Sequence, residues 1–144
     1  MFSNHVIFVL LLSIDQLTRK FAPETIINHG AIFGLGGSVY RWPLVIGGIL
    51  IIFLLFRLDK VYIRLYGPRP WFTSFYMFVM IGAVSATADR IIFAGGRDFI
   101  QAGPLVVNLG DLYCVVGMVA LTIELATNRR GNLKEIIKCF SANW

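Results

Sequence analysis

The chain has 144 residues, of which 57% are hydrophobic and 15% charged, and its mean hydropathy is +0.73. This composition is far more apolar than that of an average soluble domain, so it excludes a cytosolic globular protein, a disordered tail and a collagen-like chain. The net charge of +5 would suit a nucleic-acid-binding protein, but the positions of the charges matter more than their sum. The two cysteines, Cys114 and Cys139, are too few for a disulfide framework or a zinc site.

Four apolar stretches follow one another along the chain, at residues 2–17, 43–58, 71–93 and 104–126. Each is long enough, or nearly so, to cross a bilayer as a helix, since one span needs about 20 mostly apolar residues. The first stretch lacks the basic start and the small-residue cleavage site of a removable signal peptide. We therefore expect it to be a retained helix.

The connection between the first two stretches mixes apolar residues with several glycines, which is typical of a small strand-and-turn element. The expected fold class is thus an all-α membrane protein with four transmembrane helices and a small β-type element at 19–42 on the outer face. Residues 1–127 would form the four-helix domain, and 128–144 a basic cytoplasmic tail.

Lysines and arginines are distributed unevenly over the connections. Eight lie between the second and third stretches or in the tail: Arg57, Lys60, Arg64, Arg69, Arg129, Arg130, Lys134 and Lys138. Five lie in the opposite connections: Arg19, Lys20, Arg41, Arg90 and Arg97. Because cytoplasmic loops carry the excess of positive charge, we expect both termini in the cytoplasm. The charge then indicates topology and not binding to nucleic acid.

The chain has only eight carboxylates: Asp15, Glu24, Asp59, Asp89, Asp98, Asp111, Glu124 and Glu135. In the expected topology, Asp15 and Asp89 lie at the outer ends of the first and third helices, and Asp98 lies in the outer connection that follows. A fourth helix that begins at Pro104 would place Asp111 about 10 Å below the outer surface. Four aspartates therefore converge on one layer near the outer face.

An ionisable group in hydrocarbon costs about 2.5–3.5 kcal/mol on insertion scales, so acids at membrane depth usually face the protein interior and serve a purpose. Two neighbouring carboxylates can share one proton, so that one acts as general base on water and the other as general acid, as in aspartic proteases. Asp98 and Asp111 are our candidates for such a pair, partly because no basic residue lies between Asp111 and Asn128.

Asp15 and Asp89 would then support the pair. The alternative is that they only form ion pairs, with Arg19 and Arg90, as anchors at the membrane interface.

Other chemistries fit the sequence less well. The two histidines, His5 near the inner end of the first helix and His29 in the outer element, do not form a metal site, and we expect no metal or cofactor. A serine–lysine dyad of Ser13 and Lys20 would require the lysine to fold back into the membrane.

Four motifs follow one another in a characteristic order. They are Asp15-Gln16-Leu17-Thr18, the run from Asn28 to Gly34, the run from Gly82 through Asp89-Arg90 to Asp98-Phe99, and Asn108-Leu109-Gly110-Asp111. This series resembles that of the lipoprotein signal peptidases, the type II signal peptidases. The resemblance extends over about residues 8–125 and includes the layout of four helices with both termini inside.

The resemblance implies an aspartyl endopeptidase of the bacterial inner membrane, with the outer element on the periplasmic face. Such an enzyme cleaves the signal peptide of a prolipoprotein just before a diacylglyceryl-modified cysteine. The catalytic pair of the family falls on Asp98 and Asp111. The positions that bind or shape fall on Asp15, Asn28, Gly30, Asp89, Arg90 and Asn108. The implied partners are a lipid-modified precursor, membrane lipids and inhibitors of the globomycin type.

Several positions depart from the family pattern. Ser85 and Ala86 stand where the family has glycine and asparagine, Arg19 where it has lysine, Gly110 where it has alanine, and Ala94 where it has glycine. The first two motivate an alternative function, a catalytically silent or re-purposed paralogue that binds a lipidated or helical client without cleaving it. A small transporter is less favoured, since its acids would be spread over several depths.

Overall fold

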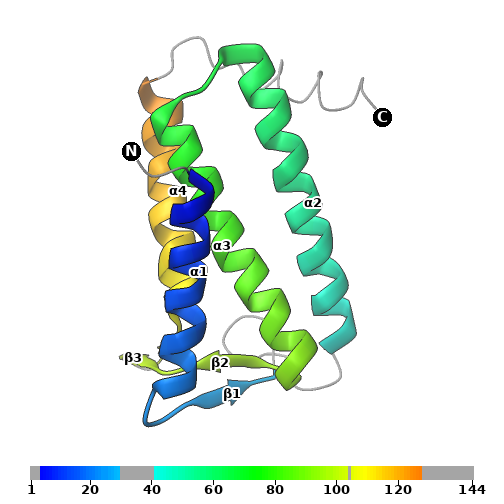
Figure 1. Cartoon of the computed structure of the whole chain (residues 1–144), viewed down its shortest axis with the longest axis vertical. Coiled ribbons are helices and arrows are strands. Elements are labelled where there is room, and N and C mark those ends of the chain that lie inside the picture. Colours follow the sequence, from blue (N-terminus) through cyan, green and yellow to red (C-terminus); the bar gives the residue numbers. More distant parts are fainter. Residues whose placement is uncertain (1–3, 30–40, 104, 128–144) are drawn as a thin grey trace.

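The computed structural model describes residues 4–29, 41–103 and 105–127. Four helices make up most of this part of the chain: α1 Asn4–Phe21, α2 Arg41–Tyr66, α3 Pro70–Phe93 and α4 Leu109–Thr127. Successive helices run in opposite directions, so that the start of α1, the α2–α3 connection and the end of α4 lie at one end of the bundle (Figure 1). The prediction of four helices in these parts of the sequence is confirmed.

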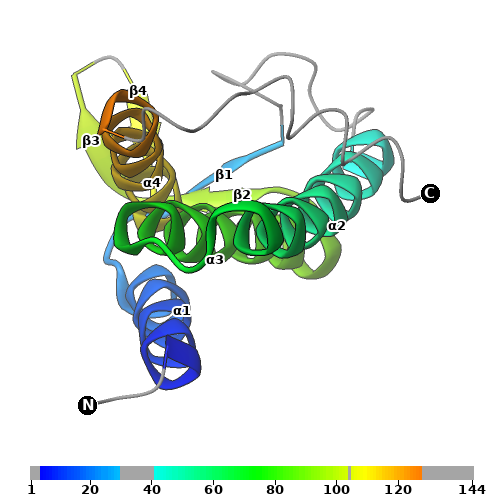
Figure 2. The same cartoon turned by 90° about the horizontal axis from the view of Figure 1, so that it is seen from above.

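Helix α3 is the central helix and contacts each of the other three. Seen from above, α1 and α4 lie on different sides of one end of α3, and α2 lies beyond its other end (Figure 2). The apolar core is rich in aromatic residues and belongs to the half of the bundle remote from the strands. Its buried members are Leu55, Val61, Tyr62, Phe72, Phe75, Met80 and Ala120.

Short strands gather at the opposite end of the bundle (Figure 1). Strand β1 (Ile26–Asn28) pairs antiparallel with β2 (Gly96–Asp98), with Ile26 opposite Asp98. Strands β3 (Ile100–Ala102) and β4 (Leu105–Val107) form a second antiparallel pair. The segment from β2 to β4 therefore leads from the end of α3 to the start of α4.

The strands confirm one expectation and correct another. Strand β1 lies within the predicted element at 19–42, although residues 30–40 of that element are outside the described part. The predicted start of the fourth helix at Pro104 is wrong, because β4 occupies the residues that follow and α4 begins only at Leu109. Periodicity alone cannot assign a short run of apolar residues to a helix or to a strand. The β-branched Val106 and Val107 favour the strand.

This shift changes the place of Asp111. The residue lies in the first turn of α4 and its side chain is exposed, so the predicted depth of about 10 Å along a helix from Pro104 is wrong. Among the described helices, α3 and α4 are long and apolar enough to cross a membrane by length and composition. The four spans of the predicted fold therefore remain a prediction.

Helices α3 and α4 approach each other closely where glycines face each other. A Cβ atom on Gly82 would lie 2.5 Å from the Cys114 Sγ and 2.7 Å from the carbonyl oxygen of Gly110, and one on Gly117 would lie 2.6 Å from the side chain of Val79. Small residues at such contacts let two backbones pack tightly, as is common between membrane helices.

Helix α3 ends with an alanine in a left-handed conformation, since Ala94 has φ 62° and ψ 11°. This conformation costs an L-residue about 1–2 kcal/mol and suits glycine, which loses more entropy on folding. We expect Ala94→Gly to raise the free energy of unfolding by about 0.5–1 kcal/mol, as the difference between these two effects. Thermal unfolding of the purified protein in detergent measures it.

Gly67 provides the matched control. It has φ +72° and open space around a Cβ atom, so Gly67→Ala should lower stability by a similar amount. A loss of stability in Ala94→Gly would contradict the conformational argument.

Candidate active site

Asn108 and Asp111 form a reciprocal cap at the start of α4. The side-chain Oδ1 of Asn108 accepts a hydrogen bond from the backbone N–H of Asp111 at 3.1 Å, and Asp111 Oδ2 accepts one from the backbone N–H of Asn108 at 3.0 Å. This is the geometry of a capping box, in which a residue and the third one after it satisfy each other's backbone donors. The spacing of these two residues therefore has a local structural cause.

Asn108 also contacts the second aspartate of the predicted pair. Its Nδ2 donates to Asp98 Oδ1 at 2.6 Å, and the Nδ2 of Asn28, in the neighbouring strand β1, is 3.2 Å from Asp98 Oδ2. Both oxygens of Asp98 therefore accept from amides, and the residue is only 5% exposed. One asparagine thus contacts both aspartates, and it does so from the junction of β4 and α4.

The guanidinium of Arg19 connects this junction to two other helices. It binds both oxygens of Asp15 one turn earlier in α1, at 2.9 and 3.0 Å, and Asp89 Oδ2 in α3 at 2.8 Å. It also donates to Asn108 Oδ1 at 2.7 Å. Arg19 is 2% exposed, and Asp15 and Asp89 are fully buried. Because the Asn108 oxygen faces Arg19, its NH₂ group is turned towards Asp98.

Arg97 anchors strand β2 to the same network. Its backbone N–H and its Nη2 bind the two oxygens of Asp89 at 3.0 and 2.8 Å, and Nη2 also donates to Gln16 Oε1 at 2.7 Å. The guanidinium lies over the ring of Phe93, 4.0 Å from its centroid. These contacts fix the residue that directly precedes Asp98.

Ser85 completes the network on α3. Its hydroxyl donates to Asp15 Oδ2 and accepts from Gln16 Nε2, the latter at 2.7 Å. Two buried carboxylates, Asp15 and Asp89, thus meet two guanidinium groups and further donors, which compensates the cost of burying their charges.

The structure places six of the eight predicted site residues in this single network: Asp15, Asn28, Asp89, Asp98, Asn108 and Asp111. Arg90 lies in the last turn of α3 and donates to the carbonyl of Ala86 at 3.2 Å, and Gly30 lies outside the described residues. Asp15 and Asp89 do form ion pairs, with Arg19 as expected for Asp15 and with Arg19 and Arg97 for Asp89.

Gln16, Ser85 and Arg97 were missed as site residues. Only long-range packing brings them there, since they contact residues 69 to 81 positions away in the chain. Among the described residues, no group of three or more histidine, cysteine or acidic side chains could hold a metal ion. His29 Nδ1 lies 3.1 Å from the carbonyl oxygen of Ala94.

The described residues form a helical bundle with aspartates gathered at one end, and comparison with known proteins identifies its family. Residues 6–127 match the family model of signal peptidase (SPase) II. The chain belongs to this family, the lipoprotein signal peptidases, and is an aspartic-type membrane hydrolase that processes lipoprotein precursors.

The fold is similar to that of a solved structure described as a bacterial membrane enzyme. The TM-score is 0.70, with 18% sequence identity over 90% of this chain and 92% of the other. At this identity the likeness shows the fold alone. A search of curated proteins finds no match.

Two departures from the family pattern lie in direct contact with each other. A Cβ atom on Gly110 would lie 2.9 Å from Arg19 Nη2 and 2.9 Å from Asn108 Oδ1. An arginine at position 19, where the family has lysine, therefore uses the space that the alanine of the family would fill at position 110. The two departures are physically coupled.

This coupling predicts a non-additive pair of substitutions. Gly110→Ala alone should push the guanidinium away from Asn108, at a cost of about 1–3 kcal/mol that the better helix propensity of alanine offsets in part. In the Arg19→Lys protein, whose side chain at position 19 is smaller, Gly110→Ala should cost less than it does in the unaltered protein. We expect a coupling energy of about 1 kcal/mol between the two substitutions. Unfolding of the four proteins of this cycle measures the coupling, and strict additivity would contradict it.

Proposed function

We propose that the chain is an intramembrane aspartyl endopeptidase in which Asp98 and Asp111 form the catalytic pair and cleave the signal peptide of a diacylglyceryl-modified prolipoprotein or a related lipidated client. The observation that carries this proposal is the double contact of Asn108, which binds Asp98 through its side chain and Asp111 through its backbone. It brings a buried and an exposed carboxylate to one junction at the strand end of the bundle.

The surroundings of the two aspartates support different roles. Asp98 accepts amide hydrogen bonds at both oxygens, which fix the orientation of its carboxyl group and suit the role of general base. Asp111 is exposed, which gives it access to the scissile carbonyl oxygen, and we assign it the role of general acid. Asp98 takes a proton from water, whose oxygen attacks the scissile carbonyl carbon while Asp111 protonates the carbonyl oxygen. As the C–N bond breaks, the proton on Asp98 passes to the leaving nitrogen, and one hydroxyl of the tetrahedral intermediate returns its proton to Asp111.

The remaining predicted residues would act by support or binding. Asn28 and Asn108 orient Asp98 through their amides. Asp15 and Asp89 hold Arg19, which in turn orients Asn108. Arg90, at the end of α3, and Gly30 are proposed to contact the substrate near the scissile bond.

All four helices expose large apolar side chains, which supports four spans in the bacterial inner membrane. Examples are Val9 on α1 (59% exposed), Ile46 on α2 (65%), Ile92 on α3 (67%) and Val115 on α4 (61%). With the alternating helix directions of Figure 1 and the excess of basic residues on one side, we propose cytoplasmic termini and a periplasmic strand end. The aspartates would then lie near the periplasmic surface, in contact with membrane lipids.

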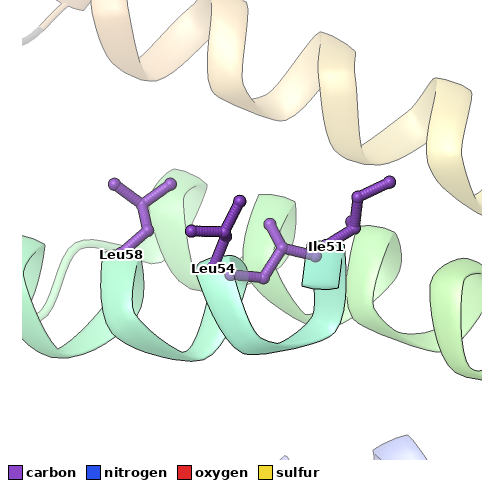
Figure 3. A pocket seen from close by; sticks show the side chains of 4 residues that line it. Ile51, Leu54 and Leu58 are labelled. Atoms are coloured by element: carbon purple, nitrogen blue, oxygen red, sulfur yellow. The ribbon is translucent and has the colours of Figure 1, made fainter. Parts of the chain in front are cut away.

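A hollow on α2 could receive the apolar part of the substrate. It has a volume of about 310 Å³ and is lined by Ile51, Leu54, Leu55 and Leu58. Figure 3 shows the four side chains from close by, with Ile51, Leu54 and Leu58 labelled. The lining is entirely aliphatic, as the apolar segment of a signal peptide requires. A globomycin-type inhibitor would compete with this substrate.

A silent paralogue that binds a client without cleaving it is the second candidate. The substitutions at Ser85 and Ala86 favour it. The structure shows that the hydroxyl of Ser85 is engaged with Asp15 and Gln16, so position 85 contributes to the buried network. Stable binding of a precursor with no release of peptide would favour this second candidate.

Substitution of either aspartate tests the proposal. Asp98→Asn and Asp111→Asn should each lower cleavage of a lipid-modified precursor by at least about a thousandfold, because each removes one half of the acid–base pair. The measurement is peptide release by purified protein in lipid nanodiscs. Asp59→Asn, on α2 away from the site, is the matched control and should cleave normally.

Folding must be monitored in the same samples. Asn keeps the size of Asp but exchanges one acceptor oxygen for an NH₂ donor. Asp98→Asn therefore leaves one of the two amide donors to Asp98 without its acceptor, and we expect the melting temperature of this variant to fall by several degrees while the protein still folds. Near-normal cleavage by either variant would refute the paired-aspartate mechanism.

A further inference from the structure

A buried hydrogen bond joins α2 to α4 at the end remote from the aspartates. The hydroxyl of Tyr62 donates to Glu124 Oε1, and the two residues are 2% and 3% exposed. The ring of Phe72, from α3, stacks on that of Tyr62 with centroids 3.6 Å apart and planes within 5°. Side chains from three helices therefore fill the space between α2 and α4 at this level. The proposed chemistry makes no use of this ionisable group.

This pair lies on the same face of α2 as the aliphatic hollow. Ile51, Leu55, Leu58 and Tyr62 follow one another at intervals of four, three and four residues, which places them on one stripe of a helix. Tyr62 is one turn beyond Leu58. Because Tyr62 reaches Glu124 on α4, the stripe faces the space between α2 and α4. The two helices lie further apart at the strand end than at this end (Figure 1).

The distance between the pair and the proposed catalytic end follows from α4 itself. Glu124 is 13 residues after Asp111 in one continuous helix, which corresponds to about 20 Å. A helical substrate segment of about 13 residues would span the same distance. The apolar segments of signal peptides are about 7–15 residues long, so this distance lies within their range.

We propose that Tyr62 and Glu124 form a bar that closes the inner end of the hollow on α2 and limits the length of the apolar segment the enzyme accepts. This inference rests on the proposed function, since it needs cleavage at the level of Asp98 and Asp111. Segments of up to about 13 residues fit between the scissile bond and the bar. A longer segment meets the bar and has to leave the surface of α2, which removes apolar contacts from the bound state.

The polar nature of the bar supports a role beyond filling space. A carboxyl group buried among aromatic rings costs free energy that two aliphatic side chains would not. The hydrogen bond between Tyr62 and Glu124 joins α2 directly to α4, whereas the main packing of each is against α3. It therefore fixes the separation of these two helices at the inner end of the hollow.

The test is a series of lipid-modified precursors that differ only in the apolar segment, with about 9, 13 and 17 residues. For the unaltered full-length protein in nanodiscs, we expect similar kcat/KM for the two shorter substrates. For the longest substrate we expect a value at least about tenfold lower, since about one helical turn of its apolar residues is no longer buried against the enzyme. The double substitution Tyr62→Ala with Glu124→Ala should restore cleavage of the longest substrate to within about threefold of the others.

Two controls separate the bar from general effects. Glu124→Gln keeps an acceptor for Tyr62 and should keep the length limit. Tyr66→Ala removes the next ring along α2, beyond the bar, and should also keep it. If the double variant does not fold, the cleavage rates of the three substrates by the unaltered protein and by Glu124→Gln still test the proposal, because both proteins are expected to show the length limit.

The outcomes for this proposal and for the proposed function differ. Equal cleavage of all three lengths by the unaltered protein, or a length limit that persists in the folded double variant, would overturn the bar and leave the peptidase function standing. Failure to cleave any member of the series would instead count against the peptidase function.

Discussion

The buried guanidinium of Arg19 is the interaction on which the strand end of the molecule depends. It is the point where α1, α3 and the start of α4 meet, through Asp15, Asp89 and Asn108. Removing one partner of such a buried pair leaves an uncompensated charge, which costs about 3–5 kcal/mol. The three elements are therefore held in one arrangement.

Arg19 affects the site through the side-chain amide of Asn108. With its oxygen bound to Arg19 and to the first turn of α4, Asn108 can only direct its NH₂ group elsewhere, and it meets Asp98. Arg97 fixes β2 from the other side through Asp89. The bundle is thus divided into a polar end, where the aspartates are positioned, and an aromatic end, where Tyr62, Phe72 and Phe75 pack.

Much of the fold follows from the sequence because hydropathy alone separates four helices in a chain this apolar. The gathering of the aspartates at one level could also be predicted, since acids are scarce and helix direction alternates. The strands from β2 to β4 could not, because runs of three residues carry no distinctive period. Neither could the contacts of Gln16, Ser85 and Arg97, which depend on packing between helices distant in sequence.

Contacts in the structure explain several of the departures from the family pattern. Arg19 and Gly110 share one space, and Ser85 adds a hydroxyl to the buried network. Ala94 differs, since it keeps the left-handed turn that the glycine of the family would adopt more easily. Two of the departures at the polar end, Arg19 and Gly110, therefore lie against each other, and Ser85 belongs to the same buried network, while Asp98 and Asp111 are retained.

Asn108→Asp tests the central claim, that one asparagine orients the catalytic pair, most directly. Aspartate caps a helix as well as asparagine does, but it replaces the donor to Asp98 with a charged acceptor. Steady-state cleavage by the folded protein should show kcat lower by at least about a hundredfold, with KM nearly unchanged. A kcat equal to that of the unaltered protein would contradict the account.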